Sequence, residues 1–203
     1  MRPLYSPVLR LAPEIWAGLA LLGFVGFSAF EEGSLLWPGV CAALAGLLAV
    51  YGFGGPRNTH AKPSGVLAPV DGRVAFRREC HDPYLGREAI RIGIAIKPWA
   101  NYLFRSPVEG EVSSIPGSHR RVSRIQTDEG DEIVLVVSKG KLFGGRPVWV
   151  PIGERVGQGK RCGVRRAALW MDVYLPANAR VEVQMSQDVK SGETLLATLL
   201  RKN

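Results

Sequence analysis

Two long apolar runs near the N-terminus constrain the fold of this chain more than any other feature of its sequence. Residues 15–30 hold sixteen positions without a charge, and residues 35–53 hold nineteen after the polar segment 31–34. At a rise of about 1.5 Å per residue, a helix over the second run reaches most of a hydrocarbon core of roughly 30 Å. We therefore expect a helical transmembrane hairpin over residues 1–55. A helical hairpin buried in a soluble core is the alternative.

Charged and small residues around these runs refine the hairpin prediction. The positive-inside rule places both ends of the hairpin, and the domain that follows, on the cytoplasmic side of the membrane. This placement follows from the basic residues that flank the runs: Arg2, Arg10, Arg57 and Lys62. Small residues spaced four apart in the second run predict close packing of the two helices: Gly39 with Ala43, and Ala42 with Gly46.

Beyond the apolar runs the sequence changes to strand patterns. Residues 56–66 contain several glycines and prolines and are predicted to be a linker. Isoleucines alternate with other residues between Ile90 and Ile96, which is the period of a strand with one buried face. Residues 124–127 and 132–137 predict a hairpin around a turn with Gly130. Residues 67–203 are therefore expected to form a mainly β domain.

Two glycine-bearing turns indicate what kind of β domain this is. Residues 152–160 and 186–194 share a valine that precedes a turn with glycine. Such turns recur in lipoyl-type domains and in other compact β structures, because glycine permits the tight reversal between short strands. We expect a compact β sandwich or barrel-like core with lipoyl-type turns. Two unrelated hairpins would give the same pattern.

The charge of the chain indicates its partners. The net charge is +8, of which residues 1–56 contribute −1, so the remainder carries +9. A basic domain beside an apolar segment suits an anionic membrane surface. A nucleic-acid partner is disfavoured, because basic residues are not interleaved with aromatic ones in a recognisable motif.

Cysteine and histidine spacing gives no sign of a disulfide framework or of a metal site. Three cysteines, Cys41, Cys80 and Cys162, are few, odd in number and widely separated, which favours a reducing compartment. The sequence Cys80-His81-Asp82 lacks the ligand spacing of a metal site, so no metal is expected.

Six short motifs, in order and at matching spacing, resemble those of the short form of phosphatidylserine decarboxylase. They are Phe53-Gly-Gly-Pro-Arg57, Ala68-Pro-Val-Asp-Gly-Arg-Val74, Arg105-Ser-Pro-Val-Glu-Gly110, Gly159-Lys-Arg-Cys-Gly163, Asp172-Val-Tyr-Leu-Pro176 and Val189-Lys-Ser-Gly-Glu-Thr194. Each motif alone is weak, since Pro-x-Asp-Gly is simply a good turn. Together they cover most of the chain.

The resemblance implies a specific chemistry. In that family an Asp and a His activate a Ser, whose hydroxyl attacks the preceding carbonyl, and the ester formed eliminates to leave a pyruvoyl group. The pyruvoyl group then acts as the electron sink for decarboxylation of phosphatidylserine to phosphatidylethanolamine, and no added cofactor is needed. Matched by motif, the family's Asp falls on Asp71 and its His on Tyr102. The Gly and Ser of its cleavage pair fall on Ala168 and Leu169.

These replacements predict a relative that does not process itself. Leu169 has no hydroxyl for the acyl shift and no β-oxygen to eliminate, so no pyruvoyl group is expected. A tyrosine side chain, with an ordinary pKa of about 10, is a poor general base near pH 7. We expect a membrane-anchored homologue, a pseudoenzyme in phospholipid metabolism, that binds an anionic or amino phospholipid or a partner protein. Asp71, which precedes Gly72, can equally be a turn residue with local backbone hydrogen bonds.

Two other readings stay open. One is an active decarboxylase that uses another nucleophile. Gly117-Ser118, which precedes His119, is the one Gly-Ser pair of the β domain, and it has the character of a polar loop. His60 in the linker and His81 in a polar turn are further histidines without a motif. The other reading is a structural subunit that pairs with an authentic decarboxylase or with itself. An intact chain of 22.1 kDa, or two fragments, distinguishes the first reading from the rest.

Overall fold

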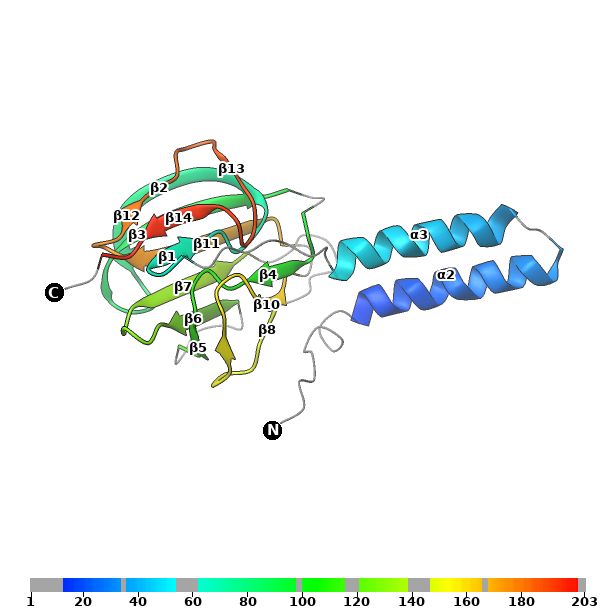
Figure 1. The fold of residues 1–203 in the computed structure, drawn as a ribbon, viewed down its shortest axis with the longest axis horizontal. Coiled ribbons are helices and arrows are strands. Elements are labelled where there is room, and N and C mark those ends of the chain that lie inside the picture. The colour runs from blue at the N-terminus through cyan, green and yellow to red at the C-terminus, as the bar shows by residue number, and fades with distance from the viewer. Residues whose placement is uncertain are drawn as a thin grey trace. The chain divides into compact units, whose positions relative to one another are not determined.

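The chain divides into two compact units, Met1–Pro56 and Arg57–Asn203. The computed structural model describes residues 13–33, 36–53, 62–97, 100–115, 121–138, 147–165 and 168–200. The first unit contains the helices α2 (Pro13–Glu31) and α3 (Leu36–Phe53). The second unit consists of strands (Figure 1).

The transmembrane hairpin that we predicted is wrong. Helices do form over the two apolar runs, but within the described part of the chain neither is long and apolar enough to cross a membrane. The 19 residues of α2 extend about 28 Å, and the helix includes Glu14 and Glu31 near its two ends. The 18 residues of α3 extend about 27 Å, which is also below the roughly 30 Å of a hydrocarbon core.

The two helices approach each other closely at glycines of α2, whereas from the sequence we expected the glycines of α3 at the contact. A Cβ atom added at Gly26 would lie 3.2 Å from the Cβ of Cys41, and one added at Gly18 would lie 2.7 Å from Leu48. These glycines are eight residues apart, so they lie on the same face of α2. Gly39 and Gly46 of α3 meet nothing within 4 Å. The small residues of α2, rather than those of α3, therefore allow the close contact.

Fourteen strands are found in the described part of the second unit. They are β1 (Gly65–Leu67), β2 (Gly72–Asp82), β3 (Arg87–Ile96), β4 (Leu103–Arg105), β5 (Gly110–Ser113), β6 (Val122–Gln126), β7 (Glu132–Val137), β8 (Val148–Trp149), β9 (Arg155–Val156), β10 (Arg161–Val164), β11 (Trp170–Pro176), β12 (Arg180–Val181), β13 (Asp188–Val189) and β14 (Leu195–Thr198). The largest sheet has eight strands in the order β13-β2-β3-β11-β7-β6-β5-β9. Two three-stranded sheets have the orders β1-β14-β12 and β4-β10-β8.

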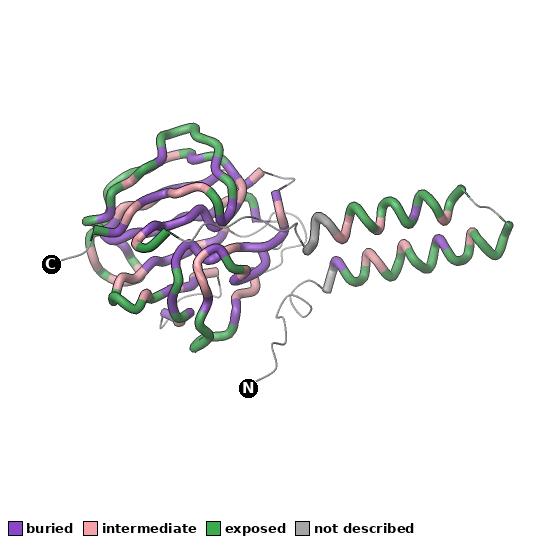
Figure 2. Tube along the Cα trace, in the orientation of Figure 1, coloured by how far each residue is buried: buried purple, intermediate pink, exposed green. Residues whose placement is uncertain are grey.

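One hydrophobic core joins these three sheets. Ile92 of β3 and Met171 of β11 pack in the same buried cluster as Phe104 of β4 and Leu196 of β14. The buried positions concentrate along the central strands, as the purple segments of Figure 2 show. The described strands form three separate sheets around this core and do not close into a barrel, so the barrel-like core that we predicted is also wrong.

The strand β11 is one of the two central strands of the large sheet, next to β7. It pairs with β3 from Trp170↔Ala95 to Pro176↔Ala89 and with β7 from Met171↔Val137 to Tyr174↔Val134. Met171, Val173 and Leu175 alternate in the sequence with Trp170, Asp172 and Tyr174, which is the pattern of a strand with one buried face, but Asp172 and Tyr174 on the second face are buried as well. The strand ends at Pro176, because proline cannot donate to a ladder.

Glycine turns lie where the sequence placed them. Gly130 has a φ of 86° between β6 and β7, which pair from Val122↔Val136 to Gln126↔Glu132. Gly159 and Gly192, of the two similar turns, have φ values of 71° and 74°. The strands before these turns, β9 and β13, are the two edges of the large sheet. The two similar segments therefore lie at opposite ends of one sheet.

Candidate functional site

Asp71 joins two distant segments of the β domain. Its Oδ1 atom accepts a hydrogen bond of 2.8 Å from the backbone amide of Ser191. The hydroxyl of Ser191 donates to the carbonyl of Pro69 at 2.9 Å, and the amide of Gly192 donates to Ala68 at 2.8 Å. Asp71 and Ser191 are separated by 120 residues. The carboxylate therefore holds a tertiary contact between two motif segments, whereas the turn alternative assigned it local partners.

Two further motif segments meet next to the first pair. The amide of Ser106 donates to the carbonyl of Lys160 at 2.8 Å, and the amide of Gly159 donates to Ser106 at 2.8 Å. The Arg105 guanidinium donates to the carbonyl of Gly159 at 2.8 Å. The Arg105 amide donates to Pro69 at 2.9 Å, which connects this pair to the Asp71 segment. Motifs far apart in the sequence are therefore neighbours in the fold.

A buried arginine connects the positions of Tyr102 and Ala168. The backbone amide of Arg165 donates to the carbonyl of Tyr102 at 3.0 Å. Its guanidinium donates to the carbonyl of Ala168 at 3.1 Å and to that of Ala100 at 2.6 Å. Arg165 is only 1% exposed, Ala168 is fully buried and Tyr102 is 7% exposed. The structure thus brings Tyr102 and Ala168 to one place, and no sequence motif had pointed to Arg165.

Leu169 lies on the other side of β3 from Asp71. The amide of Ile96 donates to the carbonyl of Leu169 at 2.9 Å, and the amide of Lys97 donates to the carbonyl of Asp71 at 3.3 Å. Since β2 and β11 flank β3, about 10 Å of sheet separates these two backbone positions. Asp71, Tyr102, Ala168 and Leu169 therefore gather at one end of the β domain.

Leu169 and Cys162 offer little reactive chemistry at this end of the β domain. Leu169 is 43% exposed and carries only carbon atoms beyond its backbone. Cys162 of β10 is 1% exposed, and burial raises the pKa of its thiol to about 12, so it is not a thiolate at neutral pH. The other reactive groups considered from the sequence, His60, Ser118 and His119, lie outside the described residues.

Cys80, His81 and Asp82 have separate partners. Cys80 packs against a small hydrophobic cluster with Tyr174, and His81 contacts the carboxylate of Glu88 at 3.3 Å. Asp82 is buried and accepts a hydrogen bond from the amide of Tyr84 at 2.8 Å. Across the residues that the structure describes, no three His, Cys, Asp or Glu side chains are grouped to hold a metal ion.

Asp172, on the strand that begins directly after Leu169, is the centre of a hydrogen-bond network that we did not predict from the sequence. Asp172 accepts hydrogen bonds from the Arg91 guanidinium at 2.7 Å and from the Trp170 indole at 3.0 Å. Arg91 also lies over the ring of Phe76, which packs at 5.8 Å from Trp170. The hydrogen bond to Asp172 raises the pKa of Arg91 above its ordinary value. The alternation of Trp170, Asp172 and Tyr174 was the available signal, but periodicity alone does not identify partners on other strands.

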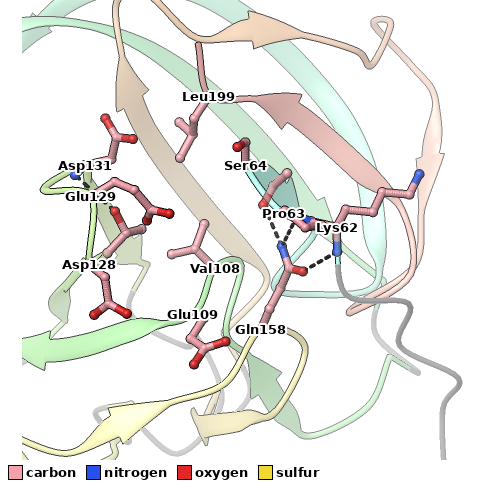
Figure 3. A pocket seen from close by; sticks show the side chains of 12 residues that line it. Lys62, Pro63, Ser64, Val108, Glu109, Asp128, Glu129, Asp131, Gln158 and Leu199 are labelled. Carbon is pink, nitrogen blue, oxygen red and sulfur yellow. Dashed lines mark hydrogen bonds between the residues drawn. The ribbon is translucent and has the colours of Figure 1, made fainter. Parts of the chain in front are cut away.

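The described residues also line a pocket of about 240 Å³ away from these positions (Figure 3). The pocket is lined by Lys62, Pro63, Ser64, Gly65, Val108, Glu109, Thr127, Asp128, Glu129, Asp131, Gln158 and Leu199. Gln158 closes one side, because its amide nitrogen donates to the carbonyl of Gly65 at 2.6 Å and its oxygen accepts from the amide of Lys62 at 2.7 Å. Arg155 pairs with Asp128 and with Glu109, so part of the acidic charge is neutralised.

These features define a chain with a helical unit and a β domain that gathers its motif segments at one end. No family model matches the chain. The chain is 30% identical over 208 residues to the phosphatidylserine decarboxylase proenzyme of Burkholderia vietnamiensis, covering 93% of this chain and 96% of that protein. The proenzyme of Burkholderia cenocepacia gives the same identity and coverage. The chain therefore belongs to the phosphatidylserine decarboxylase family, which works in phospholipid metabolism.

A comparison with solved structures gave a weaker likeness. The glucose permease IIA from Mycoplasma capricolum has 21% sequence identity and a TM-score of 0.45, over 66% of this chain and 93% of that one. Sequence kinship, rather than this likeness, identifies the family.

Proposed function

We propose that this chain is a member of the family that does not cleave itself and that acts by binding phospholipid. One observation carries the proposal: the residue that follows the carbonyl of Ala168 is Leu169. Self-cleavage needs a hydroxyl or thiol on residue 169. Its oxygen or sulfur first attacks the carbonyl of residue 168 to form an ester or thioester, and the elimination that follows breaks its bond to the β-carbon. The residues present therefore do not fit a self-derived pyruvoyl group.

The surroundings of Leu169 support the same reading. Tyr102 takes the position of the assisting histidine, and Asp71 uses a carboxylate oxygen to bind the amide of Ser191. Cys162 lies on β10, in a different sheet from β11, and its raised pKa of about 12 keeps the thiol protonated at neutral pH. A protonated, buried thiol is a poor replacement for the missing hydroxyl.

Two surfaces support phospholipid as the partner. Residues 57–203 carry a net charge of +9, which favours an anionic phospholipid surface over a neutral one. Large apolar side chains are exposed on the helices, and exposed patches of this kind mark interaction sites. They are Trp16, Leu21, Phe24, Val25, Phe27, Phe30, Leu36, Trp37, Val40, Leu44 and Leu47.

Mass spectrometry of the purified full-length chain tests the absence of self-cleavage. We expect one species of 22.1 kDa, no carbonyl that reacts with hydrazine reagents, and no CO2 released from phosphatidylserine. If the chain is instead found as two fragments, with the cut before a Ser, Thr or Cys and a reactive carbonyl on the second fragment, then it is an active decarboxylase that uses another nucleophile.

Vesicle flotation of the full-length chain tests lipid binding. We expect more binding to phosphatidylserine-containing vesicles than to phosphatidylcholine vesicles, and the difference should shrink as salt screens the charges. Equal binding to both vesicle types would remove the charge argument. A chain that binds neither vesicle but co-elutes with an authentic decarboxylase would instead be a structural subunit.

A further inference from the structure

The carbonyl of Ala168 has a charged hydrogen-bond donor that the family motifs do not account for. The Nη1 atom of Arg165 lies 3.1 Å from this carbonyl oxygen, and the Nη2 atom lies 2.6 Å from the carbonyl oxygen of Ala100. The planar guanidinium thus spans two backbone oxygens that come from different segments. Its position is fixed by two contacts rather than by one, which is the arrangement that a preorganised donor needs.

Burial increases the effect of this donor. Arg165 is 1% exposed, and it is the largest fully buried side chain in the described part of the protein. In a water-poor interior a guanidinium stabilises a nearby negative charge more strongly than it would in water. Moving a charge to such a place is costly unless polar groups accept its hydrogen bonds. The carbonyls of Ala168 and Ala100 serve as such acceptors.

We propose that Arg165 is positioned as an oxyanion donor at the carbonyl of Ala168, although this chain has no nucleophile at residue 169. The proposal rests on the proposed function in one respect, since it takes Ala168 and Leu169 as the position of the family's cleavage pair. A carbonyl oxygen gains negative charge when a nucleophile adds to its carbon. Donors about 2.7–3.1 Å from that oxygen then stabilise the charge more than they stabilise the neutral carbonyl.

The step that Arg165 would assist can be written out for a chain with a restored nucleophile, Ala168→Gly, Leu169→Ser and Tyr102→His. The introduced hydroxyl adds to the carbonyl carbon of residue 168 and gives its proton to the introduced imidazole, while the carbonyl electron pair moves to the oxygen beside Arg165. Collapse of this oxyanion breaks the bond to the nitrogen of residue 169, which takes the proton. The product is an ester. Loss of the α-proton of residue 169 then expels the carboxylate of residue 168 and separates the two fragments.

Self-cleavage of this restored triple variant is the first test. We compare its cleavage rate with Arg165 intact and after Arg165→Lys or Arg165→Met. We expect the methionine variant to cleave about 100-fold more slowly or worse, which is the effect of losing one oxyanion donor. The lysine variant should fall between, because one ammonium group lacks the fork that reaches both carbonyls. Arg161→Met, on the strand β10 that ends directly before Arg165, is the matched control and should leave the rate unchanged.

The second test uses the chain with its own residues at 102, 168 and 169. Carbon-13 labelling of alanine carbonyls reports on the hydrogen bond to Ala168 directly, and Ala168→Gly identifies its signal. We expect Arg165→Met to move the Ala168 carbonyl signal upfield, with circular dichroism and the melting temperature showing that the fold is retained. This test does not depend on self-cleavage, so it stands even if the unmodified chain proves to be cleaved elsewhere.

Three results would overturn the proposal. The first is an Ala168 carbonyl signal that Arg165→Met does not move in a folded chain. The second is equal cleavage of the restored variant with and without Arg165. The third is a restored variant that does not cleave at all, because a positioned donor would then have no effect on the reaction. Cleavage of the unmodified chain at another residue would instead contradict the proposed function.

Discussion

Replacing Asp172 tests whether the ion pair with Arg91 fixes the central strand of the large sheet. Asp172 accepts one hydrogen bond from Arg91 and one from the Trp170 indole. Its side chain is 10% exposed and that of Arg91 is 25% exposed. The Nε atom of Arg91 is buried without a hydrogen-bond partner. We consider two variants: Asp172→Asn, which keeps an acceptor for Trp170, and Asp172→Ala, which removes both acceptors.

The expected loss follows from these contacts. A hydrogen bond to a charged group contributes about 1.5–3 kcal/mol to stability and a neutral one about 1 kcal/mol. Asp172→Asn should therefore cost about 1.5–3 kcal/mol and Asp172→Ala about 2.5–4 kcal/mol. Both ranges begin below the roughly 3–5 kcal/mol lost when a fully buried pair is broken, since Arg91 keeps some contact with solvent.

Urea unfolding of the full-length chain, followed by near-ultraviolet circular dichroism, measures the loss. The midpoint should fall while the slope stays unchanged, because the surface exposed on unfolding is the same. A double-mutant cycle with Arg91→Met isolates the pair, and we expect a coupling energy of about 1–2 kcal/mol. Additive effects of Arg91→Met and Asp172→Asn, within about 0.5 kcal/mol, would refute the reasoning.

Two further predictions concern the same face of the sheet. Gly93→Ala should cost about 1–3 kcal/mol by overpacking, since the new Cβ would lie 2.5 Å from Phe76 and 2.8 Å from Trp170. Gly23→Ala in α2, where nothing lies within 4 Å, is the control, and equal unfolding midpoints for the two variants would contradict the prediction. Burial raises the pKa of Tyr174 from 10.0 to about 12 in the folded chain. The protonated tyrosine should therefore contribute its full stability below pH 10, and this contribution should decline as the pH rises toward 12. When unfolding midpoints are measured against pH, Tyr174→Phe should decline less than the unmodified chain over this range. Parallel curves for the two chains would contradict the prediction.

Local sequence was enough to predict several strands and turns of the β domain. The isoleucine alternation became β3 (Arg87–Ile96), and the turn at Gly130 joins β6 to β7. These features depend on short-range rules, since side-chain direction has a period of two along a strand and glycine adopts a positive φ without a steric penalty. Family motifs are also local, and they were sufficient to indicate the family.

Helix formation was predicted correctly, but the membrane-spanning role was not. Counting uncharged positions gave runs that nearly match a bilayer, whereas α2 begins at Pro13 and ends at Glu31, so that its ends add acidic residues rather than apolar length. The close approach of the helices was also assigned to the wrong glycines, because α2 rather than α3 presents glycine at the contact. Which face of a helix meets its neighbour depends on the packed pair and not on either sequence alone.

The sequence by itself determined that position 169 lacks a nucleophile, because a leucine side chain has no oxygen or sulfur in any fold. Only the tertiary structure decided what surrounds that position. Arg165 reaches Ala168 and Ala100, and Arg91 reaches Asp172 from 81 residues away. Such contacts arise from strand pairing between distant segments of the chain. The residues next to an arginine in the sequence do not show whether its guanidinium will lie in solvent or against a buried carbonyl. Local pattern therefore fixes the chemistry available at a position, and the packed fold fixes the partners of that chemistry.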